Sequence, residues 1–188
     1  MHLATSKDPI STRDKILELA QEAMASRGYA AFSFRELAFE LGIKSASVHY
    51  HFPTKVHLGL AVAQSYRERL AADLANIVSL ALGAQEAIDS YVALFRQEAS
   101  SSQRMTFCTM LSADIHQLPP EICAEMRAFY ELNLHWLAAR FAQLGLDEDV
   151  QQERACQTFA LLQGALTGAK GQNSLVYFDL AMGALKLW

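Results

Sequence analysis

Residues 12–55 read TRDKILELAQEAMASRGYAAFSFRELAFELGIKSASVHYHFPTK, and this stretch decides the fold that we expect. An amphipathic helical pattern comes first, and two short helical patterns follow it, with a tight turn at Gly42 between them. The last pattern, SASVHYHF, contains small residues, aromatics and histidines but no acidic residue. This layout is typical of a helix-turn-helix, whose last helix enters the major groove of DNA.

Local signals predict where the two short helices begin and end. Ser33 and Glu36 match a capping box, in which each residue's side chain accepts a hydrogen bond from the other's backbone N–H. Gly42 follows the last apolar residue of the second helix, where a left-handed residue is needed. We expect Ser45 to cap the third helix, and Pro53 to end it because the residue before a proline disfavours helix.

The remaining sequence also has helical periodicity, and no stretch shows the alternation of a strand. A long helix is expected from Thr54 to about Leu82, extending from the first unit into the second. Further helices are expected to begin near residues 84, 103, 119, 147 and 173. The fold class is therefore all-α with about nine helices. In the first helix the residues expected to face the core are Ile16, Ala20, Ala23 and Met24.

Composition sets limits on the class of protein. The 188 residues are 52% hydrophobic and 19% charged, which is an ordinary globular balance. No apolar run reaches the length of a membrane span, no signal peptide opens the chain, and the three cysteines have no paired spacing. We therefore expect a cytoplasmic protein without a membrane partner. The net charge of −4 is unusual for a nucleic-acid binder. Residues 42–55, however, contain lysines and histidines and no acidic residue.

Residues 12–60 resemble the N-terminal domain of the TetR family of bacterial transcription regulators. The resemblance covers about a quarter of the chain. It is carried by Arg13 with Ile16-Leu17, Gly28-Tyr29, Phe32 to Leu41, Gly42-Ile43, Ser47-Val48-His49-Tyr50-His51-Phe52 and Lys55. It implies a helix-turn-helix domain at 10–55, with the motif at about 33–52, and a helical ligand-binding and dimerisation domain at 56–188. The family usually has a tyrosine where this chain has His49, so either His49 or Tyr50 could meet the DNA backbone.

The candidate DNA contacts lie on and beside the third helix. Exposed N–H groups at a helix N-terminus favour phosphate, and the first turn of a recognition helix faces base edges. The residues expected to contact a double-stranded operator are Ser33, Lys44, Ser45, Ala46, Ser47, His49, Tyr50, His51 and Lys55. Val48 and Phe52 are expected in the core, and His51 could equally be a packed histidine. No metal site is expected, because histidines two apart on a helix point to different faces.

Aromatic and sulfur-containing residues of the second domain could line a pocket for an apolar or aromatic effector. The candidates are Tyr66, Tyr91, Phe95, Met105, Phe107, Cys108, Leu111, Phe129 and Trp136. The plain alternative is that residues of these types at helical spacing form only the core. Cys108 raises a second possibility, a thiol that senses electrophiles or oxidants, although burial in this apolar segment would raise its pKa.

The last two helices are expected to form a homodimer through a four-helix bundle. The interface candidates are Phe159, Leu162, Leu166, Leu175, Phe178 and Met182, and the alternative is packing within one chain. Small residues such as Gly164 and Gly168 allow helices to approach closely.

The hypothesis is a ligand-responsive regulator, a repressor that a small apolar or aromatic effector releases from a palindromic operator. We find no paired carboxylates, phosphate loop, nucleophile elbow or metal spacing, so neither an enzyme nor a cofactor is expected. A helical interaction module that does not bind DNA is the remaining rival.

Overall fold

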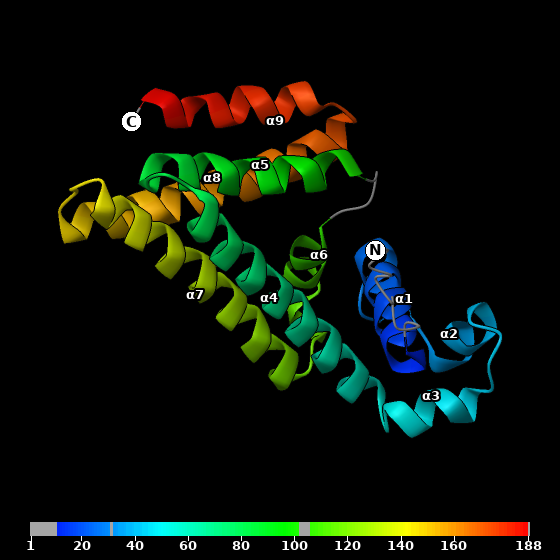
Figure 1. Cartoon of the computed structure of the whole chain (residues 1–188). Helices are drawn as coiled ribbons and strands as arrows, with labels where there is room; N and C mark the ends of the chain where they lie inside the picture. The colour runs from blue at the N-terminus through cyan, green and yellow to red at the C-terminus, as the bar shows by residue number, and fades with distance from the viewer. Residues whose placement is uncertain (1–10, 31, 102–105, 188) are drawn as a thin grey trace, which may run out of the picture.

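The computed structural model describes residues 11–30, 32–101 and 106–187, and all regular structure in these ranges is helical. The expected all-α class is thereby confirmed (Figure 1). The α-helices are α1 (Thr12–Arg27), α2 (Phe34–Glu40), α3 (Ser45–His51), α4 (Lys55–Leu80), α5 (Ala84–Ser101), α6 (Phe107–Ala113), α7 (Pro120–Gln143), α8 (Glu148–Gln172) and α9 (Leu175–Met182). Two short 3₁₀ helices follow α6 and α9, at Ile115–Gln117 and Gly183–Leu187.

The predicted caps of α2 and α3 were confirmed only in part. The capping box is present, with Ser33 N–H donating to Glu36 Oε2 at 3.1 Å and Glu36 N–H donating to Ser33 Oγ at 3.3 Å. Gly42 has a φ of +65°, as the turn between α2 and α3 requires. The expectation that Ser45 caps α3 was wrong. Lys44 occupies the N-cap position, and Ser45 is already the first helical residue.

One hydrophobic core runs through the whole described chain, from Ile16 in α1 to Met182 in α9. Ile16, Ala20, Ala23 and Met24 are all buried, as expected. Helix α1 packs against both α4 and α6, which joins the N-terminal helices to the rest of the bundle. Figure 1 shows α4 as a long diagonal helix that connects α3 to the α5 end of the molecule.

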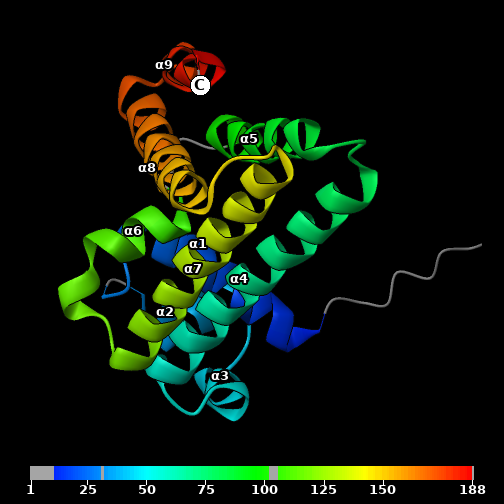
Figure 2. The same ribbon diagram turned by 90° about the vertical axis from the view of Figure 1, so that its left-hand side faces the viewer.

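The C-terminal helices stack on one another at the far end of the molecule from α3 (Figure 2). The most extensive packing is α7 against α8 and α8 against α9. Helix α9 approaches α8 closely because Gly168 has no side chain, and the ring of Tyr177 lies where a Cβ would stand. No described helix is both long and apolar enough to cross a lipid bilayer.

Gly59 is a point of close packing on α4. A Cβ at this position would lie 2.7 Å from Tyr29 Cε2 and 2.8 Å from Ile122 Cδ1. The glycine therefore allows α4 to contact the link after α1 and the first turn of α7.

We expect Gly59→Ala to lower the free energy of unfolding by about 1–3 kcal/mol, because overpacking outweighs the better helix propensity. Gly171→Ala is the matched control, since a Cβ there meets nothing within 4 Å. The control should leave stability unchanged or raise it by up to about 1 kcal/mol. Urea unfolding followed by circular dichroism measures both. Equal effects of the two substitutions would contradict the close packing at Gly59.

Candidate nucleic-acid interface

Helix α3 presents an exposed face at the edge of the molecule, away from α9 (Figures 1 and 2). Lys44, Ala46, His49 and Tyr50 are exposed, and Tyr50 retains 84% of its possible accessible surface. Val48 points inward and is fully buried. The helix therefore has one face in the core and one face free for a partner, as a recognition helix requires.

Two inward contacts fix the orientation of α3. Phe52, which follows the helix, is 3% exposed, and the guanidinium carbon of Arg13 lies 5.2 Å from the centre of its ring. The Val48 side chain is enclosed by the core of the N-terminal helices. As expected, both Val48 and Phe52 belong to the core.

His49 and Tyr50 differ in how they are held. The His49 ring packs edge-on against Phe34, with ring centres 4.7 Å apart, and its Nδ1 lies 3.4 Å from the carbonyl oxygen of Pro53. The Tyr50 ring contacts only the edge of His51 among the described aromatic pairs, at 5.2 Å. His51 is half-buried. Tyr50 therefore extends furthest from the helix, whereas His49 also braces α3 against α2.

Lys55 has contacts inside the protein that its sequence position did not indicate. Its Nζ donates a hydrogen bond to the carbonyl oxygen of Ala30 at 2.8 Å and lies 4.5 Å from the Phe32 ring centre and 5.1 Å from that of Tyr29. Burial lowers the pKa of Lys55. The ammonium group thus holds the α1–α2 link against the start of α4, and its expected phosphate contact stays a prediction.

The N-terminal and C-terminal helices meet at Tyr29 and Asp114. The backbone N–H of Tyr29 donates to Asp114 Oδ2 at 2.8 Å, joining the α1–α2 link to the end of α6. The sequence suggested Asp114 only as a possible polar anchor. Its partner lies 85 residues away along the chain, so no local pattern could identify it.

The residues expected to line an effector pocket largely pack against one another. Tyr66 lies 5.0 Å from Phe107 and 5.2 Å from Phe129, measured between ring centres. Tyr91 similarly contacts Phe95 at 4.9 Å and Trp136 at 5.1 Å.

Of the residues expected to line the effector pocket, two border a cavity in the structure. Tyr66 and Phe95 line a cavity of about 530 Å³ between α1, α4 and α5. Phe107, Cys108 and Leu111 are buried in the core, and Met105 lies outside the described residues. The assignment of the whole set to one pocket therefore stays a prediction.

Cys108 is fully buried, and burial raises its pKa. Its Sγ lies 3.4 Å from Thr106 Oγ1 and donates to Gln163 Oε1 at 3.6 Å. A thiol in this environment stays protonated and inaccessible, which disfavours attack on an electrophile.

The prediction that the inward stripes of α8 and α9 form the dimer interface requires a correction. Phe159, Leu162, Leu166, Phe178 and Met182 are all less than 9% exposed within the single chain. They form the strongest apolar stripes of α8 and α9, and those stripes are covered by α5 and α7 and by each other. Only Leu175, of the six, is partly exposed.

A second apolar stripe on α9 faces outward. Val176 is 63% exposed and Leu180 is 76% exposed, four residues apart on one face of the helix. Gly164 on α8 is also exposed, and a Cβ there would meet nothing within 4 Å. An outward dimer surface on α8 and α9 would therefore use these residues rather than the inward stripe.

Groups of three or more His, Cys, Asp or Glu that could hold a metal ion do not occur among the described residues.

Comparisons with known proteins agree with the geometry of α1–α4. Residues 16–62 match the family model described as "Bacterial regulatory proteins, tetR family". The HTH-type transcriptional repressor KstR2 of Mycolicibacterium smegmatis is 22% identical to this chain, over 90% of this chain and 97% of the relative.

Solved structures extend the similarity to the whole fold. A TetR transcriptional regulator from Legionella pneumophila is 29% identical, covers 96% of this chain and 98% of its own, and superposes with a TM-score of 0.91. The reduced form of NemR from E. coli superposes with a TM-score of 0.83 over 93% of this chain and 94% of its own, at 17% identity. At that identity, the likeness to NemR concerns the fold alone.

The burial of Cys108 predicts that it does not react with Ellman's reagent in the folded protein. We expect Cys108→Ser to leave the number of thiols titrated in the native state unchanged and to remove one thiol from the number titrated in denaturant. The substitution replaces sulfur by oxygen, so circular dichroism should first establish that the variant is folded. A lower native-state count in the variant would show that Cys108 is accessible.

Proposed function

Because the chain belongs to the TetR family of bacterial regulatory proteins, we propose that it is a ligand-responsive repressor that binds a palindromic operator as a homodimer. The family is one of DNA-binding transcriptional regulators. The observation that carries the proposal is the exposed face of α3 at the edge of the molecule. The chain from this helix through residue 55 also has no acidic side chain. That combination matches the negative charge and the width of a major groove.

The DNA contacts follow from which side chains are free. Tyr50 and Lys44 are exposed on α3 and at its N-cap, so they can donate to phosphate oxygens. Ala46 is exposed and small, so its methyl group can approach a thymine methyl. His49 is held against Phe34, which supports Tyr50 as the residue that meets the backbone.

Two-fold symmetry is needed because one recognition helix binds weakly. In the DNA-competent dimer the two α3 helices must lie about 34–36 Å apart, one turn of duplex. The outward stripe of Val176 and Leu180 on α9 and the exposed Gly164 on α8 support an interface through these two helices. This surface lies far from α3, so a small tilt at the interface changes the α3 spacing considerably.

The effector would act through the helices that join the two ends of the molecule. Helix α4 continues from the α3 turn into the C-terminal bundle, and Asp114 ties the end of α6 to the backbone of Tyr29. An effector that binds better to one arrangement of α4 and α6 shifts the dimer away from the DNA-competent spacing. The thiol-sensing alternative is disfavoured by the burial and the raised pKa of Cys108.

The proposal predicts salt-dependent binding to duplex DNA that flanks the gene for this protein. Fluorescence anisotropy between 50 and 200 mM salt (chosen because phosphate contacts dominate there) should give a steep linear fall of log K with log salt concentration. Lys44→Ala should reduce that slope by about one and Tyr50→Ala should weaken binding about tenfold.

Arg127→Ala is the control, since Arg127 is exposed on α7 in the C-terminal helices. It removes one positive charge, as Lys44→Ala does, and should leave the slope unchanged. A salt-independent affinity, or equal slopes for the two variants, would rule out α3 as the DNA-contacting helix. The interaction module without DNA binding would then be the better description.

The dimer surface gives a separate prediction. Sedimentation equilibrium should show a dimer for the wild type and a monomer for the double variant Val176→Glu/Leu180→Glu, because two carboxylates would be buried at the interface. Leu82→Glu is the control, since Leu82 is 97% exposed after the end of α4. A double variant that remains dimeric, or a control that dissociates, would contradict the outward stripe as the interface.

A further inference from the structure

The ring of His49 has one nitrogen bound inside the protein and one nitrogen left over. His49 lies exposed in the last turn of α3. Its Nδ1 lies 3.4 Å from the carbonyl oxygen of Pro53, and its ring packs edge-on against Phe34. A carbonyl oxygen only accepts hydrogen bonds, so Nδ1 carries the hydrogen that this contact uses. In the neutral ring, Nε2 therefore has a lone pair and no hydrogen.

This tautomer decides which partners His49 can bind. A phosphate oxygen also only accepts hydrogen bonds, so it cannot pair with the lone pair of Nε2. Protonation places a hydrogen on Nε2 and gives the ring a positive charge, and both changes favour a phosphate. Tyr50, its neighbour on the exposed face, needs no such change, because its hydroxyl already carries a hydrogen to donate. The two side chains therefore differ in how they depend on pH.

No carboxylate of the described chain is paired with His49. The acidic residues of α1 and α2, the two helices that pack against α3, are Asp14, Glu18, Glu22, Glu36 and Glu40. Glu36 is committed to the capping box and lies 4.0 Å from Arg27 Nη1. None of the ion pairs among the described residues includes His49. An anion that holds a proton on this ring must therefore come from a bound partner.

The basic groups around α3 favour DNA as that partner. Arg13 of α1 lies over the Phe52 ring, Arg35 is exposed on α2, Lys44 is the N-cap of α3, and Lys55 begins α4. These cations attract phosphates to the part of the surface on which His49 lies.

We propose that protonated His49 donates Nε2–H to a phosphate oxygen of the operator, so that DNA binding takes up a proton from the solvent. The inference rests on the proposed function, because it adds a proton-dependent contact to the same interface. The phosphate favours the protonated ring, so operator affinity is greatest at low pH and falls as the pH rises. An imidazole ordinarily changes charge between about pH 5 and 8, so acidification tightens the protein on its operator.

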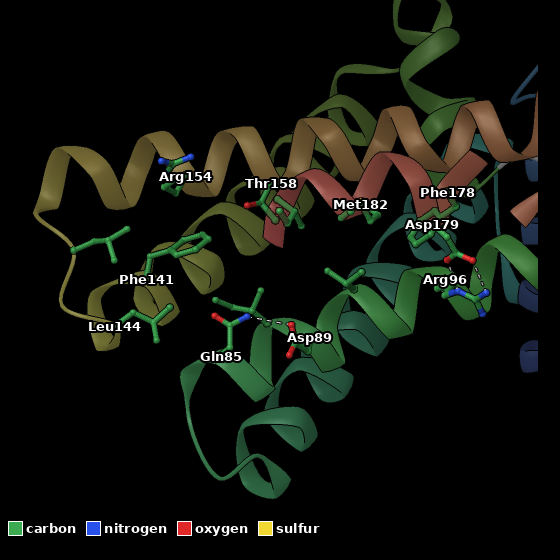
Figure 3. Close-up of a pocket in the computed structure, with 15 residues that line it drawn as sticks. Gln85, Asp89, Arg96, Phe141, Leu144, Arg154, Thr158, Phe178, Asp179 and Met182 are labelled. Atoms are coloured by element: carbon green, nitrogen blue, oxygen red, sulfur yellow. Dashed lines mark hydrogen bonds and ion pairs between the residues drawn. The ribbon is translucent and has the colours of Figure 1, made fainter. Parts of the chain in front are cut away.

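Two carboxylates in the C-terminal helices differ in whether they could add to such a pH dependence. Figure 3 shows Arg96 donating to both oxygens of Asp179, at 2.6 and 2.8 Å. These hydrogen bonds lower the pKa of Asp179, so it keeps its charge near neutral pH. Burial raises the pKa of Glu98 on α5. Variants of His49 are therefore needed to show which group couples protons to DNA binding.

Fluorescence anisotropy with the duplex that flanks the gene tests the inference at a fixed salt concentration. We expect the wild type to bind about fivefold more tightly at about pH 6 than at about pH 8. His49→Gln places a neutral N–H group near the position of Nε2, so its affinity should be equal at both pH values. His49→Tyr keeps an aromatic ring against Phe34 and should also bind equally at both. Circular dichroism establishes that each variant is folded.

His57→Gln is the matched control. His57 is exposed in the first turn of α4, and its Nδ1 lies 2.7 Å from Thr54 Oγ1. A helix N-terminus disfavours a positive charge, so this histidine is poorly placed to gain a proton on DNA binding. The control should retain the full pH dependence of the wild type.

Calorimetry of operator binding at neutral pH, in phosphate and in Tris, measures the exchanged protons directly, because the two buffers differ in ionisation enthalpy. We expect the wild type and His57→Gln to take up as much as about one proton per protomer. His49→Gln should take up none.

Three outcomes would overturn the inference: a wild-type affinity that does not change with pH, a pH dependence that survives both substitutions of His49, or proton uptake that disappears with His57→Gln. In each of them the protein still binds its operator, so the regulator function stands. Absence of operator binding at every pH would overturn the proposed function and this inference with it.

Discussion

The contact of Tyr29 with the C-terminal helices is the constraint on which the rest of the structure depends. Its ring packs on Gly59 of α4, its backbone N–H is held by Asp114, and the Lys55 ammonium lies over the ring. Tyr29 is 7% exposed, so its side chain is packed almost entirely out of contact with water. Together they connect the α1–α2 link to α4 and to the end of α6.

The contacts of Tyr29 are part of one continuous core that connects the N-terminal helices with the C-terminal ones. Close-packed interiors do not deform smoothly, so under the proposed function a rearrangement among the C-terminal helices would move α4 and α6 as rigid elements. Residues 42–55, which include α3, carry no acidic side chain, although the whole chain has a net charge of −4 and Glu36 and Glu40 lie exposed on the neighbouring α2.

Much of the N-terminal unit could be predicted because its determinants are local. The capping box of Ser33 and Glu36 spans three residues, and the turn at Gly42 needs a positive φ that glycine readily adopts. Helical periodicity likewise placed Ile16 in the core and predicted the length of α4, which ends within two residues of the expected Leu82. The same periodicity predicted the all-α class.

The sequence by itself thus determined the helical class, the capping box of Ser33 and Glu36, and α3 as the segment suited to DNA. Tertiary structure alone decided which apolar stripe of α8 and α9 faces inward, because an amphipathic pattern marks a buried face without naming the surface that covers it. The same reason explains why Leu162 is in the core and Leu180 is outside. Partners such as Asp114 for Tyr29, and Asp179 for Arg96, arise where distant segments meet, so only the packed chain could reveal them.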